Sequence, residues 1–250
     1  MRLKFMSLLV LGLLGSLVAS RGDFDPLGEE ARAHLPKLIR IQLEYIDVPQ
    51  EVMLDLMYGE KKSTDDSKLR DQLQKLLKDG TAKMLDSQMV VSRSGERSTA
   101  ESVREYIYPT EYEPSAVPSE VNSEGKKTGA TVKELATPPT PTAFETRNIG
   151  SILEAEPILG ENNSIIDMTL RPELVWHVEN EVWSEWEDSR GNSDIKMPTM
   201  YTLRLNTSVI VNKGEYLLVA AMNPKDDKGF PDITRKVMIF VKADVLSVGK

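Results

Sequence analysis

Polar and apolar side chains alternate between residues 39 and 46, which predicts a strand with one buried face, because successive side chains of a strand point to opposite sides. The apolar set of this strand is Ile39, Ile41, Leu43 and Tyr45. Pro49 can occupy the first turn of a following helix, whose apolar face would carry Val52, Met53, Leu56 and Met57. A second helix is predicted over residues 64–78, with Asp79-Gly80 as its stop, because leucines repeat at helical spacing at Leu69, Leu73, Leu76 and Leu77.

Two extended runs, residues 84–93 and 98–108, flank the compact turn Ser94-Gly95-Glu96. We expect them to form a hairpin with Gly95 in its turn, because glycine takes the backbone angles that tight turns require. The next segment, residues 109–143, is rich in proline and polar residues and has no periodic apolar face. It is interpreted as a flexible Pro-rich linker or insertion.

Residues 144–246 consist almost entirely of strand patterns. Residues 203–211 and 216–222 flank a turn in which Gly214 is expected to take a positive φ and to form a second hairpin. Gly150 is expected to form a bend or bulge. Pro157 and Pro172 are expected to end pairing at strand boundaries, since proline has no N–H to donate. The sequence therefore predicts a β-rich α+β fold with antiparallel sheets.

The first 20 residues have the three parts of a secretory signal peptide. Arg2 and Lys4 precede an apolar stretch over residues 5–18, and small residues lead to a cleavage site before Arg21. We therefore expect an exported protein whose domain comprises residues 21–108, the linker at 109–143 and a C-terminal β part at 144–250. No cysteine is present, so no disulfide contributes to stability.

Five motifs occur in a fixed order along the chain. They are the glycine turn at residues 93–97, the Ile149 to Pro157 segment, the step Leu170-Arg171-Pro172-Glu173-Leu174, the Thr207 to Glu215 segment, and the apolar strand Val237-Met238-Ile239-Phe240-Val241. This order resembles the conserved β-domain of the secretins, the ring-forming outer-membrane channels of type II and type III secretion and type IV pilus systems. The resemblance implies a homo-oligomer in the periplasm or outer membrane, with envelope secretion or pilus components as partners and a contact with the outer membrane.

The chain departs from that family in two places. Only residues 223–234 occupy the interval in which secretins usually carry a gate motif, and about 15 residues separate the expected cleavage site from the first strand, where secretins carry small ring domains. The resemblance thus implies a structural component of a secretion or pilus-type assembly. The alternative is a soluble periplasmic accessory protein that has the same fold and forms no channel.

The stretch from Trp176 to Trp186 alternates and has a tryptophan at each end. Its length and aromatic ends suit a hairpin that contacts a bilayer. Asn180 and Ser184 interrupt the apolar face, so an exposed edge strand that packs on a neighbouring subunit or on its own domain is the other interpretation.

Composition argues against several kinds of chemistry. The formal net charge of −8 disfavours nucleic acid as a partner. Because His34 and His177 are the only histidines and no Gly-x-Ser-x-Gly motif occurs, an exported hydrolase is the weakest alternative. Glutamates 179, 181, 185 and 187 and the turn at residues 226–229 lack a calcium-loop pattern. We therefore expect no catalytic residue, no cofactor and no metal.

Overall fold

The computed structural model describes residues 37–58, 63–116 and 135–246. Within these ranges the chain forms two helices, α2 (Gln50–Tyr58) and α3 (Ser67–Asp79). The strands are β1 (Leu38–Pro49), β2 (Lys83–Arg93), β3 (Ser98–Glu113), β4 (Thr140–Leu159), β5 (Ile165–Ser184), β6 (Glu187–Asp188), β7 (Gly191–Asn192), β8 (Ile195–Arg204), β9 (Thr207–Asn212), β10 (Tyr216–Met222) and β11 (Arg235–Leu246). The predicted β-rich α+β class is confirmed.

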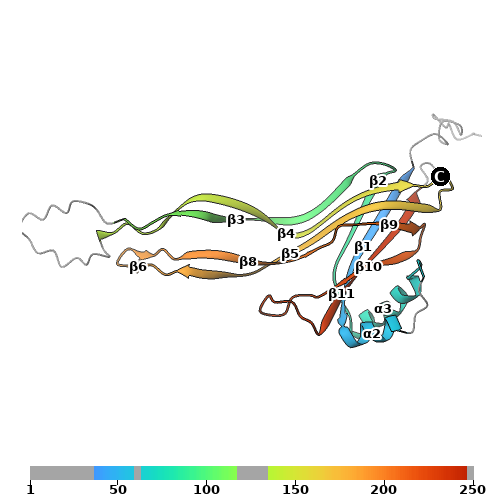
Figure 1. Ribbon diagram of the computed structural model, residues 1–250, viewed down its shortest axis with the longest axis horizontal. Coiled ribbons are helices and arrows are strands. Elements are labelled where there is room, and N and C mark those ends of the chain that lie inside the picture. The colour runs from blue at the N-terminus through green and yellow to red at the C-terminus, as the bar shows by residue number, and fades with distance from the viewer. Residues whose placement is uncertain (1–36, 59–62, 117–134, 247–250) are drawn as a thin grey trace, which may run out of the picture. The chain divides into compact units, whose positions relative to one another are not determined.

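Sheet A contains β10, β11, β1 and β2 in that order, and each neighbouring pair is antiparallel (Figure 1). β11 pairs with β1 along its whole length, from Leu38↔Leu246 to Pro49↔Arg235. Residues 43–48 of β1 are all buried, because this central strand is covered on both faces. The first strand predicted from the alternating pattern is therefore present and extends three residues further.

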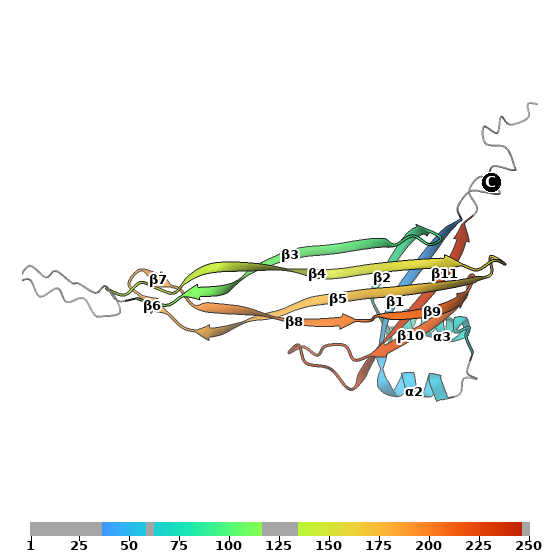
Figure 2. The ribbon, with the colours of Figure 1, turned by 45° about the horizontal axis from the view of Figure 1, so that its top comes forward.

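Sheet B contains β3, β4, β5 and β8 in that order, and β9 pairs with β5 beside β8. One face of sheet A packs against sheet B, and the interface is filled by apolar side chains that include Ile41, Leu43, Leu153, Met168 and Leu170. The opposite face of sheet A packs against the helices (Figures 1 and 2). The core thus has three layers, in the order sheet B, sheet A, helices.

Helix α3 buries Leu69 and Leu73 against sheet A, as its leucine spacing predicted. The ion pair between Arg70 and Glu44 of β1 adds a nearly buried polar contact. Gly80 ends the helix with φ 82°, which glycine adopts without steric cost. α2 begins only after Pro49 and is less firmly packed. Met57, predicted for its apolar face, is 44% exposed.

Both predicted hairpins are wrong. β2 pairs with β1 in sheet A, whereas β3 pairs with β4 in sheet B. In the same way β9 pairs with β5 in sheet B, and β10 pairs with β11 in sheet A. Gly95 and Gly214 take φ of 83° and 82°, so each turn is tight, but each one carries the chain from one sheet to the other. A turn motif sets a local change of direction, and tertiary packing selects the partner of each strand.

The expected linker is shorter than residues 109–143. β3 extends to Glu113 and β4 begins at Thr140, so Pro109 and Pro141 lie within strands. Register shifts near Pro109 and Glu111 accommodate this irregular pairing. The middle of the linker and the expected signal peptide at residues 1–20 lie outside the described residues. Within those residues no helix is both long and apolar enough to cross a membrane.

Candidate functional site

Sheet B divides into two ribbons beyond its packed half (Figure 2). β4 pairs with β5 only from Gly150 to Leu159. The rest of β4 pairs with β3 alone, and the part of β5 beyond Val175 pairs with β8 alone. We define the first ribbon as residues 104–113 with 140–149, and the second ribbon as residues 176–184 with 195–201.

Gly150 lies at the point where the ribbons part. Its φ is 128°, and a Cβ atom at this position would lie 2.2 Å from the carbonyl oxygen of Ser102. The register of β4 against β3 is unbroken there, so Gly150 does not form a bulge. It allows β4 to approach β3 closely while it separates from β5.

Pro157 and Pro172 both lie inside strands. Each is paired with a neighbouring strand on one side and lies opposite a gap between two elements on the other side. Pro172 pairs with Leu153 of β4, and its carbonyl accepts a hydrogen bond from Leu205 N at 3.1 Å, between the end of β8 and the start of β9. Pro157 pairs with Met168, and its carbonyl accepts from Gly95 N at 2.7 Å, before β3 begins. Because the N and C=O of one strand residue point to the same side, each proline places its missing donor at a gap between neighbouring elements. Pairing with one neighbouring strand stops near each proline, whereas the strand that contains the proline continues and stays paired on its other side.

The ribbons have little core of their own. Side chains on both faces of the first ribbon are exposed or half-buried, and Ile107 and Phe144 are 65% and 58% exposed. Within the described ranges, the outer edges of β3 and β8 pair with no other strand. A two-stranded ribbon is at best marginally stable in water, and an unpaired edge is a template for another strand. The two outer edges are therefore the candidate interface.

An ion-pair network crosses the outer face of sheet B. Arg97 lies 3.2 Å from Glu156 and 3.5 Å from Glu154, which also pairs with Arg171. Farther along, Glu173 lies between Arg147 and Arg204. Each exposed pair contributes little stability, but the charges alternate across β4, β5 and β8 and favour the observed register.

Side chains also join the two ribbons to each other. The ring of Tyr106 stacks on His177 with centroids 4.9 Å apart, and Tyr106 Oη donates to Asn180 Oδ1 at 2.9 Å. His177 thus contacts Tyr106 and, at 3.0 Å from its Nε2 atom, Asn180 Oδ1. Trp183 is 71% exposed, while Trp176 packs against the core. The stretch is thus a strand of the second ribbon that is anchored in the core at one end.

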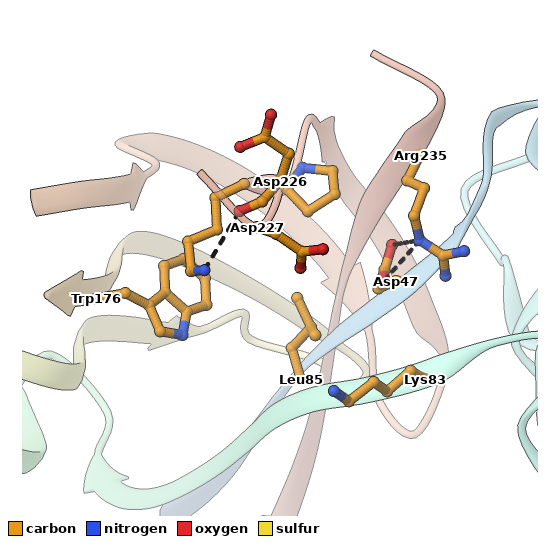
Figure 3. Close-up of a pocket in the computed structure, with 9 residues that line it drawn as sticks. Asp47, Lys83, Leu85, Trp176, Asp226, Asp227 and Arg235 are labelled. Atoms are coloured by element: carbon orange, nitrogen blue, oxygen red, sulfur yellow. Dashed lines mark hydrogen bonds and ion pairs between the residues drawn. The ribbon is translucent and has the colours of Figure 1, made fainter. Parts of the chain in front are cut away.

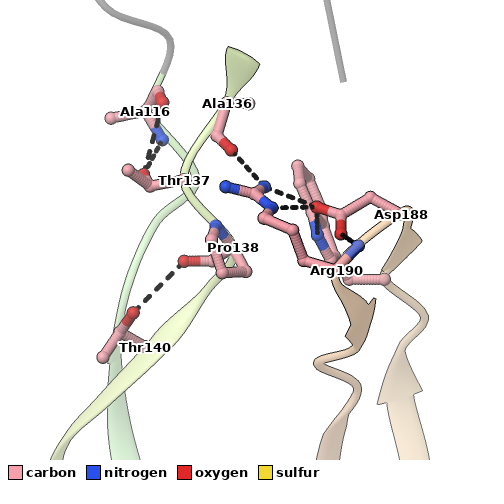
Figure 4. Close-up of polar contacts among 8 residues, drawn as sticks. Ala116, Ala136, Thr137, Pro138, Thr140, Asp188 and Arg190 are labelled. Carbon is pink, nitrogen blue, oxygen red and sulfur yellow. Dashed lines mark hydrogen bonds and ion pairs between the residues drawn. The ribbon is translucent and has the colours of Figure 1, made fainter. Parts of the chain in front are cut away.

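Figure 4 shows a second contact, where β6 and β7 meet the chain before β4. Arg190 Nη2 donates to the carbonyl of Ala136 at 2.6 Å and also binds Asp188. Hydrogen bonds from Arg190, and with a smaller effect from Trp186, hold the pKa of the Asp188 carboxyl far below its usual range. Thr137 N donates to Ala116 O at 2.9 Å, which joins the ends of β3 and β4. Neither contact was predicted, because both depend on residues that lack a periodic pattern.

The loop over residues 223–234 supports the second ribbon where it leaves the core. Tyr201 Oη donates to the carbonyl of Asn223 at 2.8 Å. Asp226 Oδ1 accepts from the N–H groups of Lys228 and Phe230, at 2.9 and 2.8 Å, which confirms the predicted turn. A Cβ atom on Gly229 would lie only 2.4 Å from Val178 Cγ1, so the loop backbone touches β5 directly.

A cavity of about 320 Å³ lies beside this loop (Figure 3). Trp176 and Leu85 form apolar walls, and the ion pair between Asp47 and Arg235 lies at one side. Burial raises the pKa of Asp47, and its hydrogen bonds with Arg235 act in the opposite direction. Acidic and basic side chains balance in the lining, so no single ligand charge is favoured. Among the described residues no cluster of three potential metal ligands exists.

The comparison with protein-family models gave no match, and neither did the comparison with curated proteins. Solved structures do match. The type II secretion secretin GspD of E. coli has a TM-score of 0.42 and 11% identity over 86% of this chain and 52% of that chain. The V. cholerae type IV competence pilus secretin PilQ gives 0.42 and 13%, over 85% and 61%. The InvG secretin domain of the Salmonella injectisome gives 0.43 and 10%, over 88% and 67%.

Each of these three proteins is a secretin. The chain spans about half to two-thirds of the length of the matched chains.

Proposed function

We propose that this protein is a secretin-like structural component of an envelope assembly for protein secretion or pilus-type transport. Copies would pair through the outer edges of β3 and β8 and so build a closed ring from identical subunits. The observation that carries this proposal is the pair of ribbons, whose faces are exposed and whose outer edges pair with none of the described strands. When the β3 edge of one copy pairs with the β8 edge of the next, the contact is head-to-tail. Such contacts close into a ring when the rotation from each copy to the next adds up to a full turn.

The proposal includes the export predicted from residues 1–20 and a location in the periplasm or outer membrane. It also includes other envelope components of the secretion or pilus machinery as partners. It involves no reaction, since the ribbons offer backbone hydrogen-bond groups and neutralised charges to a partner. The five residues Gly95, Gly150, Pro157, Pro172 and Gly214 shape the backbone in this role.

Mass measurement of the purified mature protein in mild detergent tests the proposal. A large complex of many copies is the expected result, because each ribbon edge is completed only by another copy. A species at the mass of a single chain, at all concentrations examined, contradicts it.

One observation favours a second candidate, a soluble periplasmic accessory protein. The loop over residues 223–234 fills the interval of the secretin gate motif and is tied down onto β5 and β8. The same mass measurement separates the two candidates, since an accessory protein would remain a single chain in the absence of its partner.

A further inference from the structure

Most of the charged side chains around the cavity beside the loop over residues 223–234 already have partners within the protein (Figure 3). Arg235 Nε donates to both carboxylate oxygens of Asp47, at 3.0 and 2.9 Å. Asp226 Oδ1 accepts from two N–H groups of its own loop. Lys225 Nζ donates to the carbonyl of Asp226 at 3.4 Å. Two cations and two anions of the lining are thus engaged with the protein itself.

One cation and one anion of the lining remain. Lys83 of β2 and Asp227 of the loop are exposed, and neither forms a hydrogen bond or an ion pair within the described part of the chain. Burial raises the pKa of Asp47, and the opposing attraction of Lys83 is the smallest of the effects on that carboxyl. Lys83 and Asp227 reach the cavity from different elements (Figure 3). A bound molecule can therefore pair with both charges.

The remaining walls of the cavity are apolar. Trp176 of β5 packs against the core and is half-buried, and Leu85 of β2 also packs against the core. Pro224 of the loop completes this part of the lining. The volume of about 320 Å³ lies at the lower end of the range of about 300–1,000 Å³ that is usual for small-molecule sites. The cavity therefore suits a small molecule with an apolar body.

A ligand with a single charge would meet one attractive and one repulsive side chain here, and an uncharged ligand would leave both side chains without a partner. We propose that the cavity binds the zwitterion of an amino acid or a short peptide that carries an apolar side chain. Its carboxylate binds Lys83, its ammonium group binds Asp227, and its side chain packs against Trp176. None of the lining residues belongs to β3 or β8, so this inference does not depend on the proposed function.

Isothermal titration calorimetry of the whole mature protein tests the proposal with four probes. Leucine and leucyl-leucine are zwitterions, leucine amide lacks the carboxylate, and N-acetyl-leucine lacks the ammonium group. We expect both zwitterions to bind, and each blocked probe to bind about tenfold more weakly than leucine, because it loses one charge-assisted hydrogen bond. Tighter binding of leucyl-leucine than of leucine identifies the ligand as a peptide, and the reverse order identifies it as a free amino acid.

Two variants assign the charges. Lys83→Gln should weaken the binding of leucine and N-acetyl-leucine about tenfold and leave that of leucine amide unchanged. Asp227→Asn should weaken leucine and leucine amide by a similar factor and leave N-acetyl-leucine unchanged. The matched controls are Lys68→Gln and Asp71→Asn, at exposed positions of α3, and they should leave the binding of all four probes unchanged.

Three outcomes overturn the proposal. The first is that the natural protein binds neither zwitterion at millimolar concentrations. The second is that leucine and the two blocked probes bind equally well. The third is that each variant weakens all probes alike, while circular dichroism shows that the variant is folded. The mass of the complex in mild detergent enters none of these outcomes, so a failure here leaves the proposed assembly unaffected.

Discussion

Gly150 combines two constraints that no other residue type meets. Its φ of 128° is a conformation that side chains disfavour, and the space where a Cβ atom would lie is taken by Ser102 O. Gly191 has nearly the same φ, 131°, with nothing within 4 Å of the Cβ position. An alanine substitution at Gly191 therefore costs only the free energy of the strained backbone. The same substitution at Gly150 also costs the free energy of the clash with Ser102 O.

We predict that Gly150→Ala destabilises the protein much more than Gly191→Ala. The strained backbone costs about 1–3 kcal/mol at either position, and Gly150→Ala must in addition push β4 away from β3. Urea denaturation monitored by circular dichroism measures the difference in unfolding free energy. Equal losses for the two variants would show that β3 yields without cost and that the close approach is unimportant.

The nearly buried ion pair between Glu44 and Arg70 leads to a separate prediction. Their side chains are 5% and 10% exposed. Glu44→Ala leaves a buried guanidinium without its carboxylate and should cost about 3 kcal/mol of unfolding free energy. The double variant Glu44→Leu with Arg70→Met should regain most of that loss, because two apolar residues of similar size need no partner. A double variant as unstable as Glu44→Ala would contradict this account.

Periodic elements were predictable from the sequence, and their partners were not. β1 and α3 follow from alternation and from leucine spacing, because one face of each must be buried. The turns at Gly95 and Gly214 show that the partner of a strand cannot be predicted from its local sequence. Their turn residues carry the same local signal as a hairpin, and only the stacking of two sheets separates β2 from β3 and β9 from β10.

The ribbon ends and the loop over residues 223–234 were not predictable for a different reason. Residues 109–113 and 140–143 bury neither face, so their strand conformation follows from pairing with each other. Tyr201 and Arg190 act through single hydrogen bonds to distant carbonyl groups. Such contacts leave no periodic trace in a sequence.

The loop makes a testable prediction through Gly229. Gly229→Ala should detach the loop from β5, because the new Cβ atom would overlap Val178 Cγ1 at 2.4 Å. Hydrogen exchange of residues 223–234, measured by mass spectrometry, should rise. Gly95→Ala is the matched control, since Gly95 has φ of 83° against 85° and open space at the Cβ position. Adding Val178→Ala should restore protection in the Gly229→Ala variant, and a failure to do so would mean that backbone strain alone loosens the loop.

At the scale of the whole molecule, the described residues form a packed core and two ribbons that are held mainly by strand pairing. The core consists of sheet B, sheet A and the helices, and the apolar clusters between these layers stabilise it. The ribbons depend on backbone hydrogen bonds along β3, β4, β5 and β8, with a few side-chain contacts between them. This division explains how strands exposed on both faces can persist: one end of each is anchored in the core, and the outer edges remain available to other copies.

The kind of force that joins the copies can be tested with salt. Backbone hydrogen bonds between strands of neighbouring copies are weakly screened, whereas exposed ion pairs such as Arg97 with Glu156 lose their attraction at about 1 M salt, where the screening length is about 3 Å. We therefore expect the mass of the complex in mild detergent to be the same at low salt and at about 1 M sodium chloride. The variant Arg97→Ala with Arg171→Ala, which removes two cations of the outer face, should also leave that mass unchanged. Dissociation to single chains in salt would mean that charge, and not strand pairing, holds the copies together.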